Sequence, residues 1–277
     1  MMRLSAMLMV CALVTPGVMG LVVVPNKPYG SPLLGRDLQP GGGAPSFRPA
    51  VRQTLRGGAP SMVSPDFGMK VLAPLLGNII GTSMFLSSMP AVLKASKEGK
   101  MGSLNPTPFP AQIGNCLAWL FYAIHIMNWW IIVPNCSGIL IALFYTVKTY
   151  PLLSEADKKT MTKTFSLYAL LFAGVLGGLQ TGLITASTQT AFGLMANFCL
   201  LFYYAAPMTT LATVFKTKDA SSIDLLLAVC GTANGAFWAI YGLAIKDLYV
   251  WVPNAIGAVL ALFSTLSRLI IGVKKTA

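Results

Sequence analysis

The chain has 277 residues, of which 55% are hydrophobic and only 10% are charged. A soluble domain carries about 25% charged residues, so this composition excludes an ordinary water-soluble protein and indicates a polytopic membrane protein. The formal net charge of +12 does not indicate nucleic-acid binding, because the sequence has no basic patch interleaved with aromatic residues. We therefore expect a lipid bilayer, and no nucleic acid, among its partners.

The first 66 residues differ in composition from the remainder. Residues 1–24 resemble a secretory signal peptide, with Arg3 ahead of an apolar run. Residues 25–66 are basic and rich in Pro, Gly and Ser, which predicts disorder because such a segment cannot bury a core. The pair is similar to a bipartite leader with a plastid transit segment, and the alternative is a signal peptide before an unstructured N-terminus. The two alternatives place the protein in a plastid envelope or in the plasma membrane.

Seven apolar segments follow, and each is long enough to cross a bilayer, which needs about 20 residues. They cover about 69–92, 107–127, 129–150, 162–184, 189–214, 223–244 and 248–272. Twelve basic residues follow the odd-numbered segments, against only Lys70 and Lys246 on the other side. This asymmetry predicts a C-terminus in the cytosol, with residues 273–277 as a short cytosolic tail.

The membrane part contains one signature twice, 119 residues apart. The repeated positions are Asn115 and Asn234, Trp119 and Trp238, Tyr122 and Tyr241, and Val-Pro-Asn at 133–135 and 252–254. Asn78 and Asn197 share the same offset and extend the repeat to the first helix of each half. The duplication predicts an all-α membrane protein with seven transmembrane helices in a 3+1+3 arrangement. Its parts are a first three-helix repeat at 67–150, a linker helix at 151–186 and a second three-helix repeat at 187–272.

The paired polar residues predict a site for a neutral, hydroxyl-rich solute. A pseudo-twofold axis would gather the two tryptophans and four carboxamides, of Asn115, Asn135, Asn234 and Asn254, around one cavity. Moving one hydroxyl into hydrocarbon without a partner costs about 4–8 kcal/mol, whereas asparagine offers donors and an acceptor without net charge. We therefore expect a mono- or disaccharide as substrate. The alternative for any one residue is structural, since intramembrane Asn often joins helices.

The titratable residues favour an uncoupled mechanism. None of the eight carboxylates lies in the middle of a predicted span, and the only histidine, His125, lies near the outer end of the second. Proton-coupled carriers usually place a titratable group within the membrane, so facilitated diffusion is expected. No nucleophile, metal-binding or phosphate-binding pattern occurs, so we expect neither an enzyme nor a cofactor.

Several motifs resemble the SWEET (MtN3/saliva) family of sugar transporters. They are Phe85-Leu-Ser-Ser-Met-Pro90, Pro108-Phe-Pro110, Tyr204-Ala-Ala-Pro207 and the two Val-Pro-Asn copies. The resemblance implies two three-helix bundles joined by a linker helix, bidirectional sugar uniport by alternating access, and self-association into homo-oligomers. It also implies that the sugar-site pairs are Trp119 with Trp238 and Asn135 with Asn254, and that Asn115 and Asn234 take the polar position one turn before each tryptophan.

The resemblance further implies four proline hinges near the cytosolic side. Pro108 and Pro207 match, whereas Ser88 and Asp224 occupy the other two positions, and Pro90 is expected to replace the proline missing at Ser88. Asp224 either pairs with a nearby lysine, Lys216 or Lys218, or changes the gating. Met84 and Tyr203 are expected to set the size of the pocket.

Two other functions remain open from sequence. One is a PQ-loop-type carrier of another small solute, and the other is a seven-helix membrane protein that transports nothing. A charged solute normally requires a buried countercharge, which the sequence lacks, and the internal duplication argues against a seven-helix receptor. The choice between glucose and sucrose also stays open, because pocket volume depends on helix packing.

Overall fold

The computed structural model describes residues 65–102 and 104–273, which are all-helical apart from turns and short connections. The predictions for the signal peptide, the leader up to residue 64 and the tail from residue 274 lie outside the described residues. The helices are α2 (Pro65–Phe67), the π-helical turn η1 (Gly68–Leu72), α3 (Ala73–Leu86), α4 (Met89–Glu98), α5 (Pro108–His125), α6 (Trp129–Thr149), the 3-10 turn η2 (Tyr150–Leu152), α7 (Glu155–Gln180), α8 (Thr188–Thr217), α9 (Leu225–Ala244) and α10 (Leu248–Ile271).

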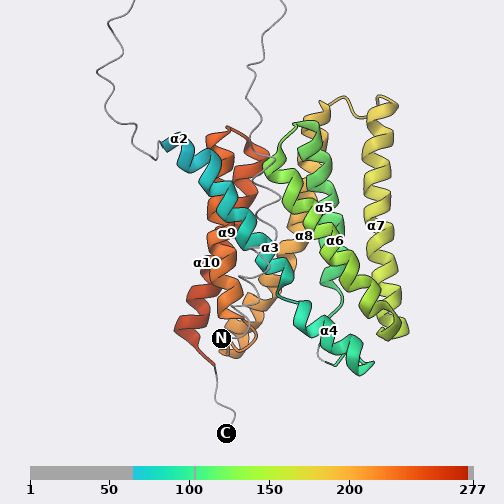
Figure 1. Cartoon of the computed structure of the whole chain (residues 1–277), viewed down its shortest axis with the longest axis vertical. Coiled ribbons are helices and arrows are strands. Elements are labelled where there is room, and N and C mark those ends of the chain that lie inside the picture. The colour runs from blue at the N-terminus through green and yellow to red at the C-terminus, as the bar shows by residue number, and fades with distance from the viewer. Residues whose placement is uncertain (1–64, 103, 274–277) are drawn as a thin grey trace, which may run out of the picture. The chain divides into compact units, whose positions relative to one another are not determined.

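The first predicted span differs from the structure in where its helix begins and in a break near its end. Helical structure begins at Pro65, so the last two residues assigned to the leader belong to α2. The helix then breaks at Ser87–Ser88, where the Ser87 hydroxyl donates to the Met84 carbonyl at 2.7 Å. Pro90 lies in the first turn of α4, where a proline is tolerated because the N–H is not needed. The expected single segment is therefore two helices, and Figure 1 shows α4 leaving the line of α3.

Capping side chains start the helices that follow the two short connections. Asn128 accepts a hydrogen bond from the Trp130 N–H and begins α6. Asp247 accepts from the Tyr249 and Val250 N–H groups and begins α10. These caps satisfy N–H groups that have no partner inside the helix. The connections are so short that α5 with α6, and α9 with α10, pack as antiparallel neighbours.

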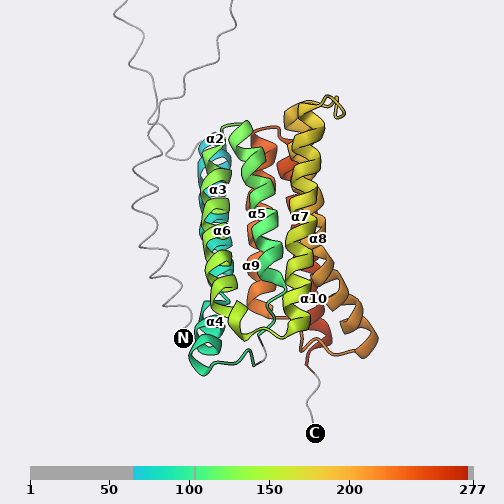
Figure 2. The ribbon, with the colours of Figure 1, turned by 90° about the vertical axis from the view of Figure 1, so that its right-hand side faces the viewer.

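Six helices form a closed ring, in which the three helices of the first half are followed by the three helices of the second half. The order of contacts is α3, α6, α5, α8, α10, α9 and back to α3. The first helix of each half thus packs against the second helix of the other half, as α3 does against α9 and α8 does against α5. Helix α7 lies outside the ring beside α5 and α8 (Figure 2).

Six of the described helical segments are long and apolar enough to cross a membrane. They are Pro65–Glu98, Trp129–Leu152, Glu155–Gln180, Thr188–Thr217, Leu225–Ala244 and Leu248–Ile271. The expected second span, now α5, is absent from this set. Gln112 and Asn115 lower its hydropathy, and many of its side chains are buried among other helices. A helix that faces protein on most sides does not need the apolar surface that lipid contact requires.

Candidate functional site

The ring of six helices encloses a cavity of about 560 Å³, to which each of these helices contributes residues. The structure brings all six sequence-predicted binding residues to this cavity: Asn115, Trp119, Asn135, Asn234, Trp238 and Asn254. None of the described residues that line it is Asp, Glu, Lys, Arg or His. The cavity therefore combines aromatic faces and neutral hydrogen-bonding groups and lacks a fixed charge.

The central helices α5 and α9 each present an asparagine one turn before a tryptophan. The four-residue spacing puts Asn115 and Trp119 on one face of α5, and Asn234 and Trp238 on one face of α9. The side-chain oxygens Oδ1 of Asn115 and Asn234 are buried and have no hydrogen-bond partner among the described residues. An unsatisfied buried acceptor costs about 1–3 kcal/mol, so both oxygens are poised to accept from a bound donor.

Asn135 and Asn254 lie on α6 and α10, directly after Pro134 and Pro253. The Asn135 amide Nδ2 donates to the Ile131 carbonyl at 2.8 Å, and the Asn254 amide Nδ2 donates to the Val250 carbonyl at 2.7 Å. These bonds fix each side chain against its own helix. One amide hydrogen and the oxygen of each remain for a ligand.

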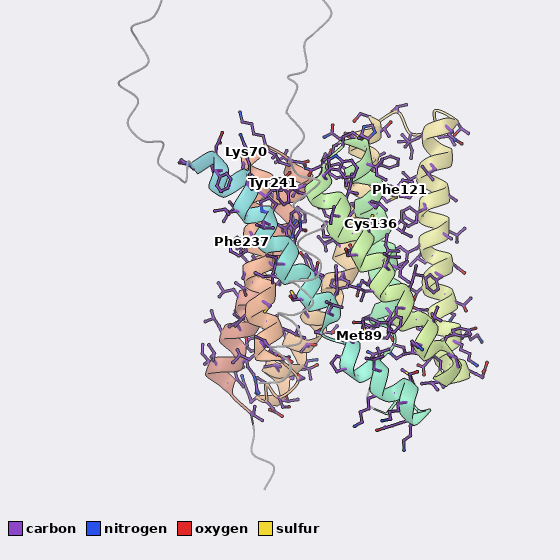
Figure 3. The ribbon with its side chains drawn as sticks, viewed as in Figure 1. Lys70, Met89, Phe121, Cys136, Phe237 and Tyr241 are labelled. Carbon is purple, nitrogen blue, oxygen red and sulfur yellow. The ribbon has the colours of Figure 1, made fainter. Side chains whose placement is uncertain are left out.

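Two reciprocal contacts connect the halves at the end where α6 and α10 begin. The Tyr122 hydroxyl donates to the Asp247 carboxylate at 2.6 Å. In the matching contact, the Asn128 amide donates to the Tyr241 hydroxyl at 2.8 Å, and that hydroxyl donates to Asn128 Oδ1 at 3.0 Å. We call these contacts the outer latch, after the side of the membrane on which the sequence predicts this end to lie. Figure 3 shows Tyr241 at the same end of the bundle as Lys70, and Met89 toward the other end.

The outer latch is in contact with the cavity through the tryptophans. Trp119 meets Tyr122 edge to face with ring centroids 6.0 Å apart, and Trp238 meets Tyr241 in the same way at 5.8 Å. Each cavity tryptophan thus supports the tyrosine that closes the end of the bundle. The repeated tyrosines are visible in the sequence, but their role depends on contacts that only the structure shows. The shared offset of 119 residues between Asn128 and Asp247 would have indicated their partners.

The predicted hinge residues lie toward the other end, and they divide into two groups. Ser88, Pro108 and Pro207 line the cavity, whereas Pro90 and Asp224 do not. Pro90 lies in the first turn of α4.

Asp224 caps α9, with its carboxylate accepting from the Leu227 N–H at 3.1 Å. In the described part of the chain, Asp224 forms no salt bridge with Lys216 or Lys218.

Met84 and Tyr203, the residues expected to set pocket size, both line the cavity. The structure adds two glycines of α3 that sequence analysis missed. A Cβ atom on Gly77 would lie 2.9 Å from Trp238 Nε1, and one on Gly81 would lie 3.2 Å from Asn234 Oδ1. The second half has Ala196 and Leu200 at the matching positions. The first half therefore gives Trp238 and Asn234 more room than the second half gives their counterparts.

Gln112 is another lining residue that sequence analysis missed. It is buried, and its Nε2 donates to the Gly138 carbonyl at 3.1 Å. Its counterpart at the repeat offset is Gly231, so the internal repeat gave no signal for it.

A ring of apolar helices around an uncharged cavity with paired polar residues defines an integral membrane protein of the carrier type. The chain belongs to the MtN3/saliva family, whose model, described as a sugar efflux transporter for intercellular exchange, matches residues 72–155 and 190–275. The two matched segments correspond to the two halves of the ring. The resemblance to the SWEET family is thereby confirmed.

Individual proteins that are similar to this chain belong to the same family. The bidirectional sugar transporter SWEET7b of Oryza sativa subsp. japonica is 29% identical over 207 residues, which cover 73% of this chain and 77% of that protein. The bidirectional sugar transporter SWEET4 of Arabidopsis thaliana is 27% identical over 194 residues, covering 68% of this chain and 76% of its own length. The 3.7 Å structure of a eukaryotic SWEET transporter superposes with a TM-score of 0.65 at 20% identity, covering 75% of this chain and 98% of that one. At this identity the structural match shows the shared fold.

Proposed function

We propose that this protein is a bidirectional, facilitative sugar transporter that works by alternating access around the central cavity. The observation that carries the proposal is the pair of buried, unpartnered oxygens of Asn115 and Asn234 inside a cavity without fixed charge. Sugar hydroxyls are donors that suit these acceptors, and Trp119 and Trp238 offer flat faces to the C–H side of a pyranose ring. The names of the SWEET relatives support the same class of substrate.

The proposed topology has seven spans in a 3+1+3 arrangement, in which α5 is a span although its hydropathy is too low for the set of six apolar segments. The first repeat comprises α3 with α4, α5 and α6, the linker is α7, and the second repeat comprises α8, α9 and α10. The closed contact ring, in which each first helix packs on the second helix of the other half, supports this assignment. The lysines in and after the last turns of α4, α6 and α8 support a topology with those ends and the C-terminus on the cytosolic side.

The outer latch and the hinge positions support a proposal for which parts of the bundle move during transport. With Tyr122 bound to Asp247 and Tyr241 bound to Asn128, the outer end is closed. Opening it breaks these hydrogen bonds, which contribute about 0.5–1.5 kcal/mol net for a neutral pair and about 1.5–3 kcal/mol for the bond to the Asp247 carboxylate. Thermal motion supplies that energy without an ion gradient. Each latch tyrosine contacts a cavity tryptophan. A sugar bound to the indole faces would therefore change the packing against the tyrosines and with it the stability of the latch. Ser88, Pro90, Pro108, Pro207 and Asp224 lie where the cytosolic ends of the helices would bend.

Flux measurements on purified protein test the proposal. The full chain is reconstituted into proteoliposomes, and uptake of labelled glucose and sucrose is measured without an ion gradient, beside Asn135→Ala and Asn254→Ala. We expect saturable uptake by the parent and loss of most of it in both variants, since each removes a cavity hydrogen-bonding group. Asn105→Ala is the control, because Asn105 lies in the connection before α5 and does not line the cavity.

Two results would contradict the proposal. Absence of flux for either sugar in folded, correctly inserted parent protein would remove the transport assignment. Full flux in both cavity variants would leave transport intact but place the sugar elsewhere.

A further inference from the structure

The proline ahead of each cavity asparagine leaves one helix carbonyl without its usual donor. Pro134 has no N–H, so the carbonyl four residues earlier, that of Trp130, loses its partner within α6. The side chain of Asn78 on α3 takes that place, with its amide Nδ2 donating to the Trp130 oxygen at 3.2 Å. The bond joins the first and third helices of the first half, one turn before Asn135.

The second half repeats the arrangement at every position. Pro253 removes the partner of the Tyr249 carbonyl within α10. The amide of Asn197 on α8 donates to that oxygen at 3.1 Å, and also to the Gly193 carbonyl of its own helix at 2.8 Å. In both halves 52 residues separate the asparagine from the carbonyl it binds. The residues that supply the carbonyl differ, being Trp130 and Tyr249, so the recurring feature is the backbone oxygen and not the side chain.

We infer that Asn78 and Asn197 are positioning residues for the sugar site, each replacing the hydrogen bond that the proline of the third helix removes. This inference rests on the proposed function, because its effect on sugar passes through Asn135 and Asn254. Each of those residues directly follows the proline and bonds back within the same turn. A third helix with an unpaired carbonyl in that turn can bend there, and the carboxamide next to the proline moves with it. Asn78 and Asn197 hold this turn against the first helix, so each cavity carboxamide keeps its place while the bundle moves.

The inference predicts a specific rescue, because alanine has the N–H that proline lacks. Asn78→Ala removes the donor and leaves the part-buried Trp130 carbonyl without this partner. The KM for the transported sugar is therefore expected to rise about tenfold while the number of inserted molecules stays the same. Asn78→Ala combined with Pro134→Ala supplies the helix's own N–H. The expected KM of this double variant is within about twofold of that of Pro134→Ala alone.

The internal repeat provides the matched control. Asn78→Ala combined with Pro253→Ala restores a donor to the wrong helix, so its KM is expected to stay as high as that of Asn78→Ala. The same four variants built on Asn197 give a second, independent set, in which Pro253→Ala rescues and Pro134→Ala does not. A residue that only fills space between helices would show no such dependence on which proline is replaced.

Thermal unfolding of the same purified variants gives a readout that does not depend on transport. The inference is supported if only replacement of the matching proline restores both the unfolding temperature and the KM. If Asn78→Ala does not fold, recovery of folded yield in the matched double variant supports it equally. Equal KM in Asn78→Ala and the parent, or equal impairment in the matched and crossed double variants, overturns it. If the folded parent carries neither sugar, the proposed function fails, and the unfolding series then decides only whether the proline carbonyls are the partners of Asn78 and Asn197.

Discussion

Gly77 provides the space that the Trp238 indole occupies. The two residues lie on helices α3 and α9, from different halves of the sequence, and an added Cβ would come within 2.9 Å of the indole nitrogen. A contact this short is relieved only by moving the ring, since the glycine is fixed in the helix backbone. One missing methyl group therefore determines where a cavity-lining aromatic face lies.

We expect Gly77→Ala to displace Trp238 and to lower kcat/KM for sugar by about tenfold, because overpacking of this kind costs about 1–3 kcal/mol. The measurement is initial uptake into proteoliposomes over a range of sugar concentrations. Gly174→Ala is the matched control, since no atom lies within 4 Å of the Cβ it would add. Alanine also favours a helix more than glycine does, so parent-like flux is expected for the control. Parent-like flux in Gly77→Ala would mean that the position of Trp238 does not limit transport.

At the scale of elements, one side chain in each hairpin connection has two tasks. Asn128 and Asp247 cap the helices that follow them, and each also binds a tyrosine of the other half. The start of a helix and the closure of the bundle are thereby joined in one residue. The two connections differ in charge, because one uses a carboxamide and the other a carboxylate.

This difference predicts that Asp247→Asn is tolerated. Asparagine caps helices about as well as aspartate and accepts from a tyrosine hydroxyl, as Asn128 already does for Tyr241. Asp247→Ala loses both the cap, worth about 0.5–2 kcal/mol, and the partner of Tyr122, so both sugar flux and unfolding temperature are expected to fall.

Ser154→Ala separates the two effects, because it removes a cap from α7 and no latch partner. Proteoliposome flux and thermal unfolding are compared across the three variants. A loss of flux in Asp247→Asn as large as in Asp247→Ala would show that the negative charge itself is required.

The same elements show how far sequence could predict the site. The offset of 119 residues located the tryptophans and asparagines, because a duplicated bundle places equivalent residues around its axis. The roles of Gly77 and Gly81 could not be predicted from the sequence, since they depend on the contact of α3 with α9, a helix of the other half. The break at Ser87–Ser88 was also missed, because neither serine is a strong helix breaker and the apolar pattern continues across it. The assignment of residues to the sugar site remains a prediction.

Across the whole described bundle, the lining of the cavity has no acidic, basic or histidine side chain. A neutral solute that crosses this cavity moves no net charge, and no titratable group of this kind is available to carry a proton with it. Transport should then follow only the difference in sugar concentration across the membrane.

We expect flux to be unchanged when a pH gradient of either sign or a potassium diffusion potential is imposed across the liposome membrane. The measurement is uptake and efflux of labelled sugar with and without ionophores that collapse each gradient, and equal rates in both directions are expected at equal concentrations. Accumulation of sugar above its external concentration when a proton gradient is imposed would show coupling, and with it a proton-binding group that the cavity lining does not reveal.

The polarity of α5 has a consequence for how the protein enters the membrane. Insertion favours segments with apolar side chains. The hydropathy of α5, with Gln112 and Asn115 in its first half, is too low for the set of apolar segments that includes α6. Only the connection around Asn128 separates the two helices. In the proposed seven-span topology, we therefore expect α5 to enter the membrane only when α6 follows it, with the two helices partitioning into lipid together as a helical hairpin. In that topology, the polar groups of α5 that line the cavity would also make membrane insertion depend on the order in which the helices leave the ribosome.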